Sequence, residues 1–257
     1  MSAKVAVAAA VNDQAVLDLC LARSDDIKDG LADLRTYRGY RSAGAAYNAA
    51  LIEADADYVV LAHQDVYLPP GSIARLAETL DKLSRSDPNW AVAGVIGLDG
   101  AGDVRGQTWS SGLNGLTGAP LTAPAQVELL DELLLVVRAA SGIRFDEALP
   151  GFHLYGTDIV QSAKARGLTS YAVPLLVIHH SRSVTSLPAD YRRAYRYVAR
   201  KWRKLLPMRT LVCPLSSNPA VLWWNDLRIR KHHRFRTTRV EPKGDPVDIA
   251  RRLGGRS

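Results

Sequence analysis

Short apolar runs alternate with helix-like segments through the first 181 residues, and this alternation narrows the fold more than any other feature. The runs Val5–Val11, Tyr58–Ala62 and Trp90–Leu98 are too short for buried helices, and each is followed by polar or turn-forming residues. Between them, Ala43–Ala54 and the stripe that follows Ser72 have helical spacing of apolar side chains. The pattern predicts an α/β domain: an open, mostly parallel sheet with helices on both faces.

The same reasoning predicts the later elements. Val127–Arg138 and Ser170–Ile178 read as two more strands, with a short helix beginning near Thr157 between them. Residues 99–126 are rich in Gly, Ser, Thr and Pro and have no period, which predicts a long loop. Ser72 is expected to cap the helix that follows the Pro-Pro-Gly breaker.

Composition excludes several classes of protein. With 47% hydrophobic and 23% charged residues, the chain is neither disordered nor collagen-like nor a coiled coil. Two distant cysteines exclude a disulfide framework and a cysteine-rich zinc module. No apolar run approaches the ~18 residues of a membrane span, and the apolar start is better explained as a buried strand than as a signal peptide. We therefore expect a cytoplasmic protein.

Basic charge is concentrated in one late segment. The net charge is +7, yet residues 1–181 hold 14 basic and 21 acidic side chains, whereas residues 182–239 hold 15 basic and two acidic ones. This asymmetry predicts a mildly acidic domain, residues 1–185, followed by a basic, partly helical extension, residues 186–257. Such an extension is suited to an anionic partner.

The extension allows three interpretations. Residues 190–206 form a basic amphipathic helix, and a second basic cluster begins at Arg228. The helix can pack its aromatic stripe on the core, or residues 190–239 can make peripheral contact with an anionic membrane at its inner face. In the third interpretation the basic residues bind nucleic acid, but the sequence contains no recognised nucleic-acid-binding module, so this partner is not expected.

Polar residues gather where the predicted strands end. Ligands of open α/β sheets bind at the carboxyl ends of strands, so these side chains are candidates for one site. A carboxylate with imidazoles suits a divalent cation such as Mn²⁺ or Mg²⁺, and a helix N-terminus favours the ionised form of Asp158, which could act as a base. Each residue taken singly also fits a turn, a helix cap or a backbone-bonded histidine. The candidates are His63, Gln64, Asp65, His153, Tyr155, Asp158, His179 and His180.

At these residues the sequence resembles a known family. The stretch AAYNAALIEADADYVVLAHQDVYLPPG, from Ala45, resembles the core of family 2-like glycosyltransferases with a GT-A fold. It looks most like the bacterial branch related to the streptomycin-biosynthesis glycosyltransferase-like domain. VELLDELLLVVR, FDEALPGFHLYGTDIVQSAKARG and YAVPLLVIHHSRS follow in the order of that family, so the resemblance covers about residues 3–185.

The resemblance implies an activity: transfer of a sugar from a UDP-, GDP- or dTDP-linked donor to a hydroxyl of a glycan or lipid-linked acceptor, with inversion, as in polysaccharide biosynthesis. At the positions that match the family's motifs, the resemblance implies that Asp65 binds the metal and that Asp158 is the general base. His179, or alternatively His180, would be the last ligand of the metal site. His63 stands where the family usually has the first Asp of its D-X-D motif. No clean second strand ending in Asp is visible in residues 24–42 to read the nucleotide base.

The remaining implied roles concern the two substrates. The expected donor-binding residues are Asn12, Asp13, Asn48, His63, Gln64 and Asp65, and the expected acceptor-binding residues are Asp131, Glu132, His153 and Tyr155. Two alternatives stay open beside this enzyme. One is a GT-A-like domain that binds a nucleotide or glycan without turnover. The other is a protein that acts on an anionic surface or nucleic acid through residues 182–239.

Overall fold

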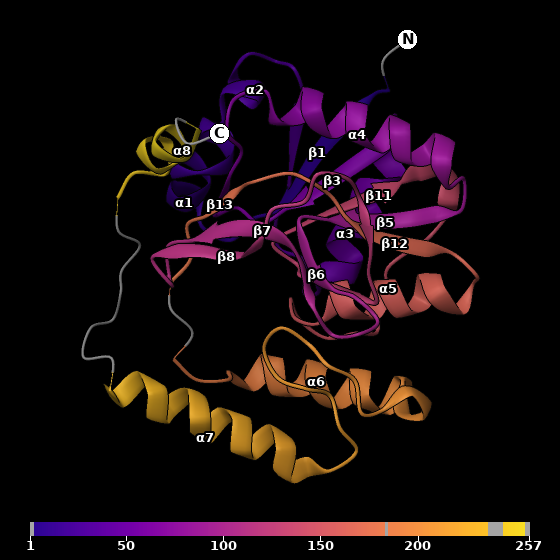
Figure 1. The fold of residues 1–257 in the computed structure, drawn as a ribbon, viewed down its shortest axis with the longest axis vertical. Coiled ribbons are helices and arrows are strands. Elements are labelled where there is room, and N and C mark those ends of the chain that lie inside the picture. Colours follow the sequence, from indigo (N-terminus) through magenta and orange to yellow (C-terminus); the bar gives the residue numbers. More distant parts are fainter. Residues whose placement is uncertain (1–2, 183–184, 236–243, 255–257) are drawn as a thin grey trace.

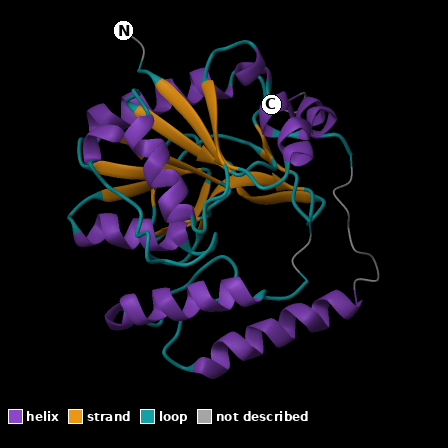
Figure 2. Cartoon of the chain, turned by 180° about the vertical axis from the view of Figure 1, so that it is seen from behind, coloured by secondary structure: helices purple, strands orange, loops and turns teal. Residues whose placement is uncertain are grey.

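A seven-stranded sheet between two layers of helices forms the centre of the molecule (Figure 1 and Figure 2). The computed structural model describes residues 3–182, 185–235 and 244–254. In the order β2-β1-β3-β11-β5-β12-β9, all strands except β11 and β9 point the same way, so the mostly parallel sheet is confirmed. The strands are β1 (Val5–Ala10), β2 (Asp33–Tyr37), β3 (Tyr58–Ala62), β5 (Trp90–Gly94), β9 (Ala125–Gln126), β11 (Leu134–Arg138) and β12 (Thr169–Ala172).

Helices cover both faces of this sheet, as the alternation predicts. Successive strand side chains point to opposite faces: Val59 and Leu61 join the apolar cluster of α3, α5 and α6, whereas Val60 and Ala62 join that of α1 and α4. The helices are α1 (Gln14–Leu19), α2 (Asp25–Lys28), α3 (Ala43–Glu53), α4 (Ser72–Ser86), α5 (Tyr155–Ala165), α6 (Ala189–Lys201), α7 (Pro219–Phe235) and α8 (Pro246–Gly254), with short 3-10 turns at Leu21–Arg23, Ala139–Ser141 and Arg203–Leu205.

A second sheet, which the sequence did not predict, lies against the first. Each of the runs Trp90–Leu98, Val127–Arg138 and Ser170–Ile178 contributes one strand to each sheet, so the expectation of single strands there was wrong. Apolar periodicity does not reveal a bend between two short strands that are both buried. The second sheet contains β10 (Leu129–Leu130), β6 (Ile96–Leu98), β7 (Val104–Ser110), β13 (Ile178–His179) and β4 (Val66–Tyr67), and β8 (Gly115–Ala119) pairs with β7.

The expectation of a long loop at residues 99–126 was also wrong, because this segment contains β7, β8 and β9. Its glycines allow close backbone approach instead of breaking the strand. Gly106 has a φ of +91°, and a Cβ there would lie 2.0 Å from the carbonyl oxygen of Val95, so only glycine fits where β7 passes β6.

The start of α4 corrects another expectation. Ser72 is the first residue of the helix and is buried, with its hydroxyl donating to the carbonyl of Pro69. Asp26 supplies the cap instead, because its carboxylate accepts from the backbone N–H groups of Gly71 and Ile73, each at 2.7 Å. A cap donated from a remote segment leaves no local sequence signal.

The basic extension packs on the core, as the first of its three interpretations expects. In Figures 1 and 2, α6 and α7 lie side by side beneath the sheet. Tyr191, Ala194, Tyr195 and Val198 of α6 are buried in the same apolar cluster as α3 and α5. Residues 236–239 of the second basic cluster lie outside the described residues, and the boundary at residue 185 stays a prediction. Within the described ranges no helix is long and apolar enough to cross a bilayer.

Candidate metal and active site

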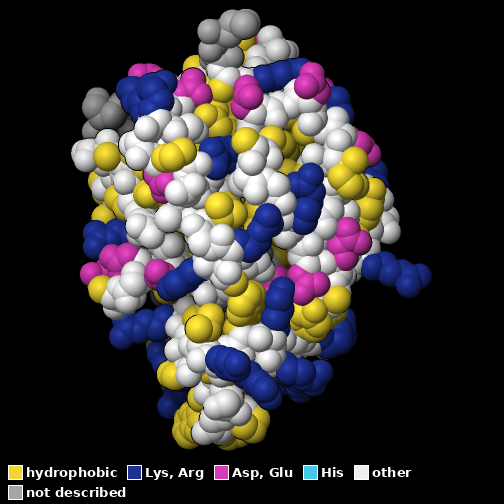
Figure 3. Space-filling view, turned by 90° about the vertical axis from the view of Figure 1, so that its right-hand side faces the viewer, with side chains coloured by type: hydrophobic (Ala, Val, Ile, Leu, Met, Phe, Trp, Pro, Cys, Tyr) yellow, Lys and Arg dark blue, Asp and Glu magenta, His cyan; other side chains and the backbone are white. Residues whose placement is uncertain are grey.

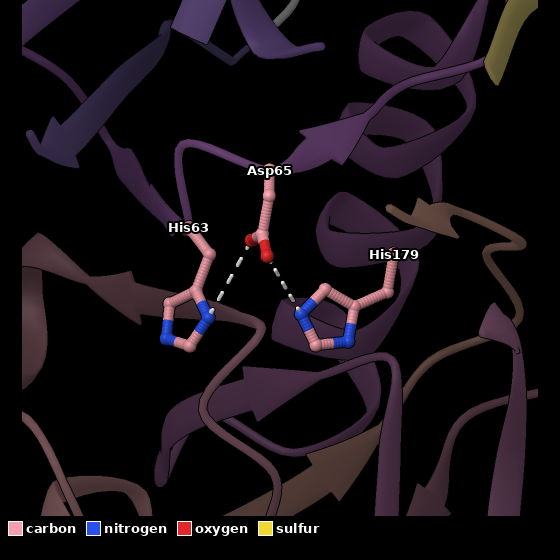
Figure 4. A group of neighbouring side chains, drawn as sticks. All are labelled: His63, Asp65 and His179. Carbon is pink, nitrogen blue, oxygen red and sulfur yellow. Dashed lines mark ion pairs between the residues drawn. The ribbon is translucent and has the colours of Figure 1, made fainter. Parts of the chain in front are cut away.

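Two imidazoles and one carboxylate converge where β3, β4 and β13 meet (Figure 4). His63 Nδ1 lies 3.9 Å from Asp65 Oδ1, and His179 Nε2 lies 3.5 Å from Asp65 Oδ2. One ligand atom from each residue lies within 4.8 Å of the others, and all three side chains are partly exposed. Nitrogen and carboxylate oxygen donors of this kind suit a divalent transition-metal cation such as Mn²⁺.

Strand pairing places these three residues together. The backbone N–H of His63, just beyond β3, donates to the carbonyl of Leu133, and a turn follows that brings Asp65 to the start of β4. Antiparallel pairing of β4 with β13 sets His179 opposite Val66. The ring of His180 points elsewhere, with its Nδ1 at 3.2 Å from the hydroxyl of Ser111. His179, and not His180, therefore lies beside Asp65.

Tyr155 fixes the orientation of His63. Its buried hydroxyl donates to the carbonyl of Glu132 at 3.0 Å and lies 2.9 Å from His63 Nε2. Because a hydroxyl has one proton, His63 Nε2 must then be the donor to Tyr155. That tautomer leaves Nδ1, the nitrogen that faces Asp65, free to bind a cation.

The charges of the three residues are coupled. Burial favours the neutral form of Asp65, but His179 and His63 outweigh this effect and hold the pKa of Asp65 below its usual value. Burial alone would lower the pKa of His179, and the hydrogen bond with Asp65 raises it instead. Burial lowers the pKa of His63. Asp65 is therefore ionised and His63 is neutral near pH 7, which are the forms that bind a metal, whereas at His179 the raised pKa makes a proton compete with the metal.

A cavity of about 560 Å³ opens beside the three residues at the ends of β1 and β2. The side-chain oxygen of Gln64 accepts from the backbone N–H groups of Asn12 and Asp13, and its Nε2 donates to Asn12 Oδ1 at 2.6 Å. The amide pair thus joins the end of β1 to the turn that carries His63 and Asp65. The lining includes Asn12, Tyr37, Arg38, Tyr40, Tyr47, His63, Gln64, Asp65 and Phe152.

Sequence reasoning missed Tyr37, Arg38 and Tyr40 in this cavity. β2 is the second strand that the sequence left ambiguous, and it ends at Tyr37, with Arg38 and Tyr40 just beyond it, instead of at an aspartate. The rings of Tyr37 and Tyr40 are 6.1 Å apart, which gives the cavity an aromatic wall beside a guanidinium. The signal was the segment TYRGYRS, where aromatic and basic residues surround a turn glycine.

Two expected donor residues have structural partners. Asp13 caps α1 by accepting from the N–H of Val16. Asn48 is buried on α3, and its amide both donates to the carbonyl of Phe145 and accepts from the N–H of the same residue. The amide of Asn48 holds the 145–147 loop and does not line the cavity at Asn12.

A second cavity, of about 360 Å³, is lined in part by residues 129–132 and 185–188. Asp131, Glu132 and His153 line it, as expected of acceptor-binding residues, whereas Tyr155 does not. His153 Nε2 is 3.4 Å from Asp190 Oδ2, and Glu132 Oε1 accepts from the N–H of Gly156 at 3.3 Å. Burial, together with the neighbouring charge of Asp131, raises the pKa of Glu132 well above its usual value.

Asp158 is withdrawn from both cavities. It lies in the first turn of α5, as expected, but only 2% of its side chain is exposed. Its oxygens accept from Lys201 Nζ at 2.9 Å and from Trp202 Nε1 at 2.7 Å. Lys201 also binds Asp146 at 2.7 Å, so this group of side chains ties the end of α6 to α5.

The raised pKa of Glu132 predicts a pH-dependent change in stability. A carboxyl whose folded pKa exceeds its unfolded value stabilises the fold below the unfolded pKa, and this stability is lost as pH rises through the folded pKa. Glu132→Gln should therefore raise Tm relative to the wild type at pH 8, by about 2–4 °C for each kcal/mol relieved, and should have no such effect at pH 4. Thermal unfolding at both pH values measures this. An equal shift at both would contradict it.

Comparison with known proteins gives distant similarities only. No protein-family model matches the chain. A Fuscovulum blasticum protein described as "ATP synthase subunits region ORF 6" is 28% identical over 169 residues, which are 61% of this chain and 64% of that protein. The chain thus spans less than two thirds of that relative's length.

Three solved structures resemble the fold. GalNAc-T7 with UDP, GalNAc and Mn²⁺ is 12% identical with a TM-score of 0.49, over 69% of this chain and 43% of its own. The mannosyltransferase PcManGT from Pyrobaculum calidifontis, with GDP-Man and Mn²⁺, is 10% identical with a TM-score of 0.49. The match covers 100% of this chain and 76% of that protein. S. aureus TarS with UDP-GlcNAc is 16% identical with a TM-score of 0.45. The match covers 77% of this chain and 66% of that chain. Identities and TM-scores this low assign no role to any residue of this chain.

Proposed function

We propose that this protein is a glycosyltransferase that moves a sugar from a nucleotide-sugar to an acceptor hydroxyl with the help of a divalent cation. The observation that carries the proposal is the group of His63, Asp65 and His179 beside the cavity at Asn12, with a second cavity lined by Asp131, Glu132 and His153. One cavity has an aromatic and basic wall suited to a nucleotide, and the other contains carboxylates suited to a sugar hydroxyl. His63 and Asp65 line the first, and the Tyr155 hydroxyl links His63 to the second.

The proposed donor is a UDP-, GDP- or dTDP-linked sugar in the cavity at Asn12. Tyr37 and Tyr40 offer ring faces for a nucleotide base, and Arg38 offers a guanidinium for its phosphates. His63, Asp65 and His179 would hold Mn²⁺ or Mg²⁺, which when bound neutralises the charge of a diphosphate leaving group. Gln64 and Asn12 keep the metal-binding turn against β1.

The proposed general base is Glu132, with Asp131 beside it. Glu132 lines the acceptor cavity, and its raised pKa brings it nearer the pH at which a base works well. Asp158, the base that the family resemblance implies, has both oxygens occupied by Lys201 and Trp202. We assign Asp158 a positioning role. Attack from the face opposite the leaving group would invert the anomeric centre, which NMR of the product reports.

The proposed acceptor is a glycan or a lipid-linked molecule, as in polysaccharide biosynthesis, and His153 would contact it beside Glu132. The proposed location is the cytoplasm, with peripheral contact at the inner face of the membrane.

Nucleotide binding tests the function directly. UDP, GDP and dTDP are each titrated with and without Mn²⁺, and release of the nucleoside diphosphate from the matching sugar nucleotides is then followed. We expect one nucleotide to raise Tm only when Mn²⁺ is present, and its sugar conjugate to be consumed. Metal-independent stabilisation without turnover would instead favour a binding domain, and no response to any nucleotide would contradict the proposal.

Removing the hydroxyl of Tyr155 should weaken metal binding. Tyr155→Phe leaves His63 Nε2 without its partner, and loss of such an outer partner costs about 10–100-fold in metal affinity. Mn²⁺ titration followed by calorimetry measures this. Tyr197→Phe is the matched control, because it removes a hydroxyl bonded to Asp146. Equal Mn²⁺ affinity in the two variants would show that Tyr155 does not position His63.

A further inference from the structure

An arginine-lined pocket lies between α6 and α7, apart from both cavities of the proposed active site. Its volume is about 480 Å³. Arg196, Arg200 and Arg203 project from one side of α6 and the turn that follows it, at spacings of four and three residues that keep them on one face. Tyr195, Ser216, Leu222 and Trp223 complete much of the wall.

These three arginines have no carboxylate partner among the described residues. The nearby Arg192, by contrast, is bonded to Asp226 at 2.6 Å, and Asp226 also accepts from Arg230. Within the described part of α6 and α7, both carboxylates are therefore already paired, Asp226 with these two arginines and Asp190 with His153. Three guanidinium groups around one pocket repel one another, and a bound phosphate would relieve this repulsion through charge-assisted hydrogen bonds.

An exposed apolar strip borders the pocket. Trp223, Trp224 and Leu227 on α7 are 61%, 58% and 41% exposed, while Leu222 and Asp226 on the opposite side of the helix are buried. Figure 3 shows Lys and Arg side chains gathered over the lower part of the molecule, with hydrophobic side chains at its lower end. Tryptophan prefers the interface between lipid headgroups and acyl chains, where basic residues meet lipid phosphates.

We propose that the α6–α7 face is a docking surface for an anionic phospholipid bilayer. The arginine pocket receives a lipid phosphate, and the Trp223–Trp224 pair enters the headgroup region beside it. Charge complementarity identifies the occupant. The three arginines would attract any polyanion, but the exposed tryptophans beside them favour a bilayer, which has an apolar layer under its phosphates. This surface rests on and deepens the peripheral membrane contact proposed above. None of its residues belongs to the proposed metal or substrate sites, so a failure of vesicle binding is distinguishable from a failure of the proposed sugar transfer.

Vesicle cosedimentation tests the docking surface. Wild-type protein is mixed with vesicles of phosphatidylcholine alone, or of phosphatidylcholine and phosphatidylglycerol in equal amounts. We expect binding to the mixed vesicles only, weakening as salt is added. Replacing Arg196, Arg200 and Arg203 together by Gln should lower the partition coefficient by about a hundredfold, at about fivefold for each basic residue. Trp223→Ala with Trp224→Ala should also weaken binding.

The control triple replaces Arg85, Arg144 and Arg166, which are exposed elsewhere, with Gln. It removes the same net charge and should bind vesicles like the wild type, and thermal unfolding confirms that all variants fold. Equal loss in both triples would overturn the proposal, because net charge alone would then explain binding. Binding to neutral vesicles as tight as to mixed ones, or binding of a mixed-sequence RNA that outcompetes mixed vesicles, would overturn it too. Mn²⁺-dependent nucleotide binding should not change in any of these variants.

Discussion

Asp65→Ala is expected to abolish Mn²⁺-dependent nucleotide binding. Asp65 is the only carboxylate of the three candidate ligands, and both of its oxygens face an imidazole. Its removal leaves two neutral ligands and no anionic oxygen to bind the cation. We expect Mn²⁺ affinity to fall by more than about a hundredfold, beyond the usual cost of losing an outer partner. Calorimetric titration of Mn²⁺, followed by the nucleotide, measures both steps.

The fold should survive this change, because Asp65 lies at a strand end and its side chain is 24% exposed. Substitutions outside the core usually alter stability only slightly. Asp29→Ala is the matched control, an exposed aspartate elsewhere. Unchanged metal-dependent affinity in Asp65→Ala would refute the metal site, and a loss in His179→Ala but not in His180→Ala would support the assignment of His179.

Glu132→Gln is expected to lower sugar transfer by about 10²–10⁴-fold, the usual contribution of a positioned base. Gln keeps the shape of the side chain and can still accept from the N–H of Gly156, but it cannot take a proton from the acceptor. Donor affinity should stay unchanged, because a base acts on the acceptor. The wild-type rate should rise with pH through the raised pKa of Glu132, and the remaining activity of the variant should lack this rise.

Asp158→Asn separates a base from a positioning residue. The variant keeps an acceptor for Trp202 but loses the buried ion pair with Lys201, so its main expected effect is a lower Tm. Transfer at a temperature where the variant is folded should remain close to that of the wild type. A loss of 10²–10⁴-fold at unchanged Tm and donor affinity would return the base to Asp158 and refute the role of Glu132.

The sequence by itself determined that the centre is a mostly parallel sheet with helices on both faces, and that His63 and Asp65 follow the end of one of its strands. Tyr58–Ala62 is too short and too apolar to be anything but a buried strand, so His63 and Asp65 had to emerge at its end, where ligands of open sheets bind. The helix at Ala43 followed in the same way, because its apolar side chains recur three or four positions apart. Local periodicity is sufficient for features of this kind.

Only the tertiary structure decided which of these residues meet. The pairing of β13 with β4 places His179 beside Asp65 and turns His180 toward Ser111, a choice that adjacent histidines in a sequence cannot reveal. Asp158 has the position of a base in the sequence, but Lys201, 43 residues away, occupies its carboxylate. Hydrogen bonds between remote segments depend on how strands and helices dock, and that docking is set by packing of the whole core, which carries no signal in the few residues around a motif.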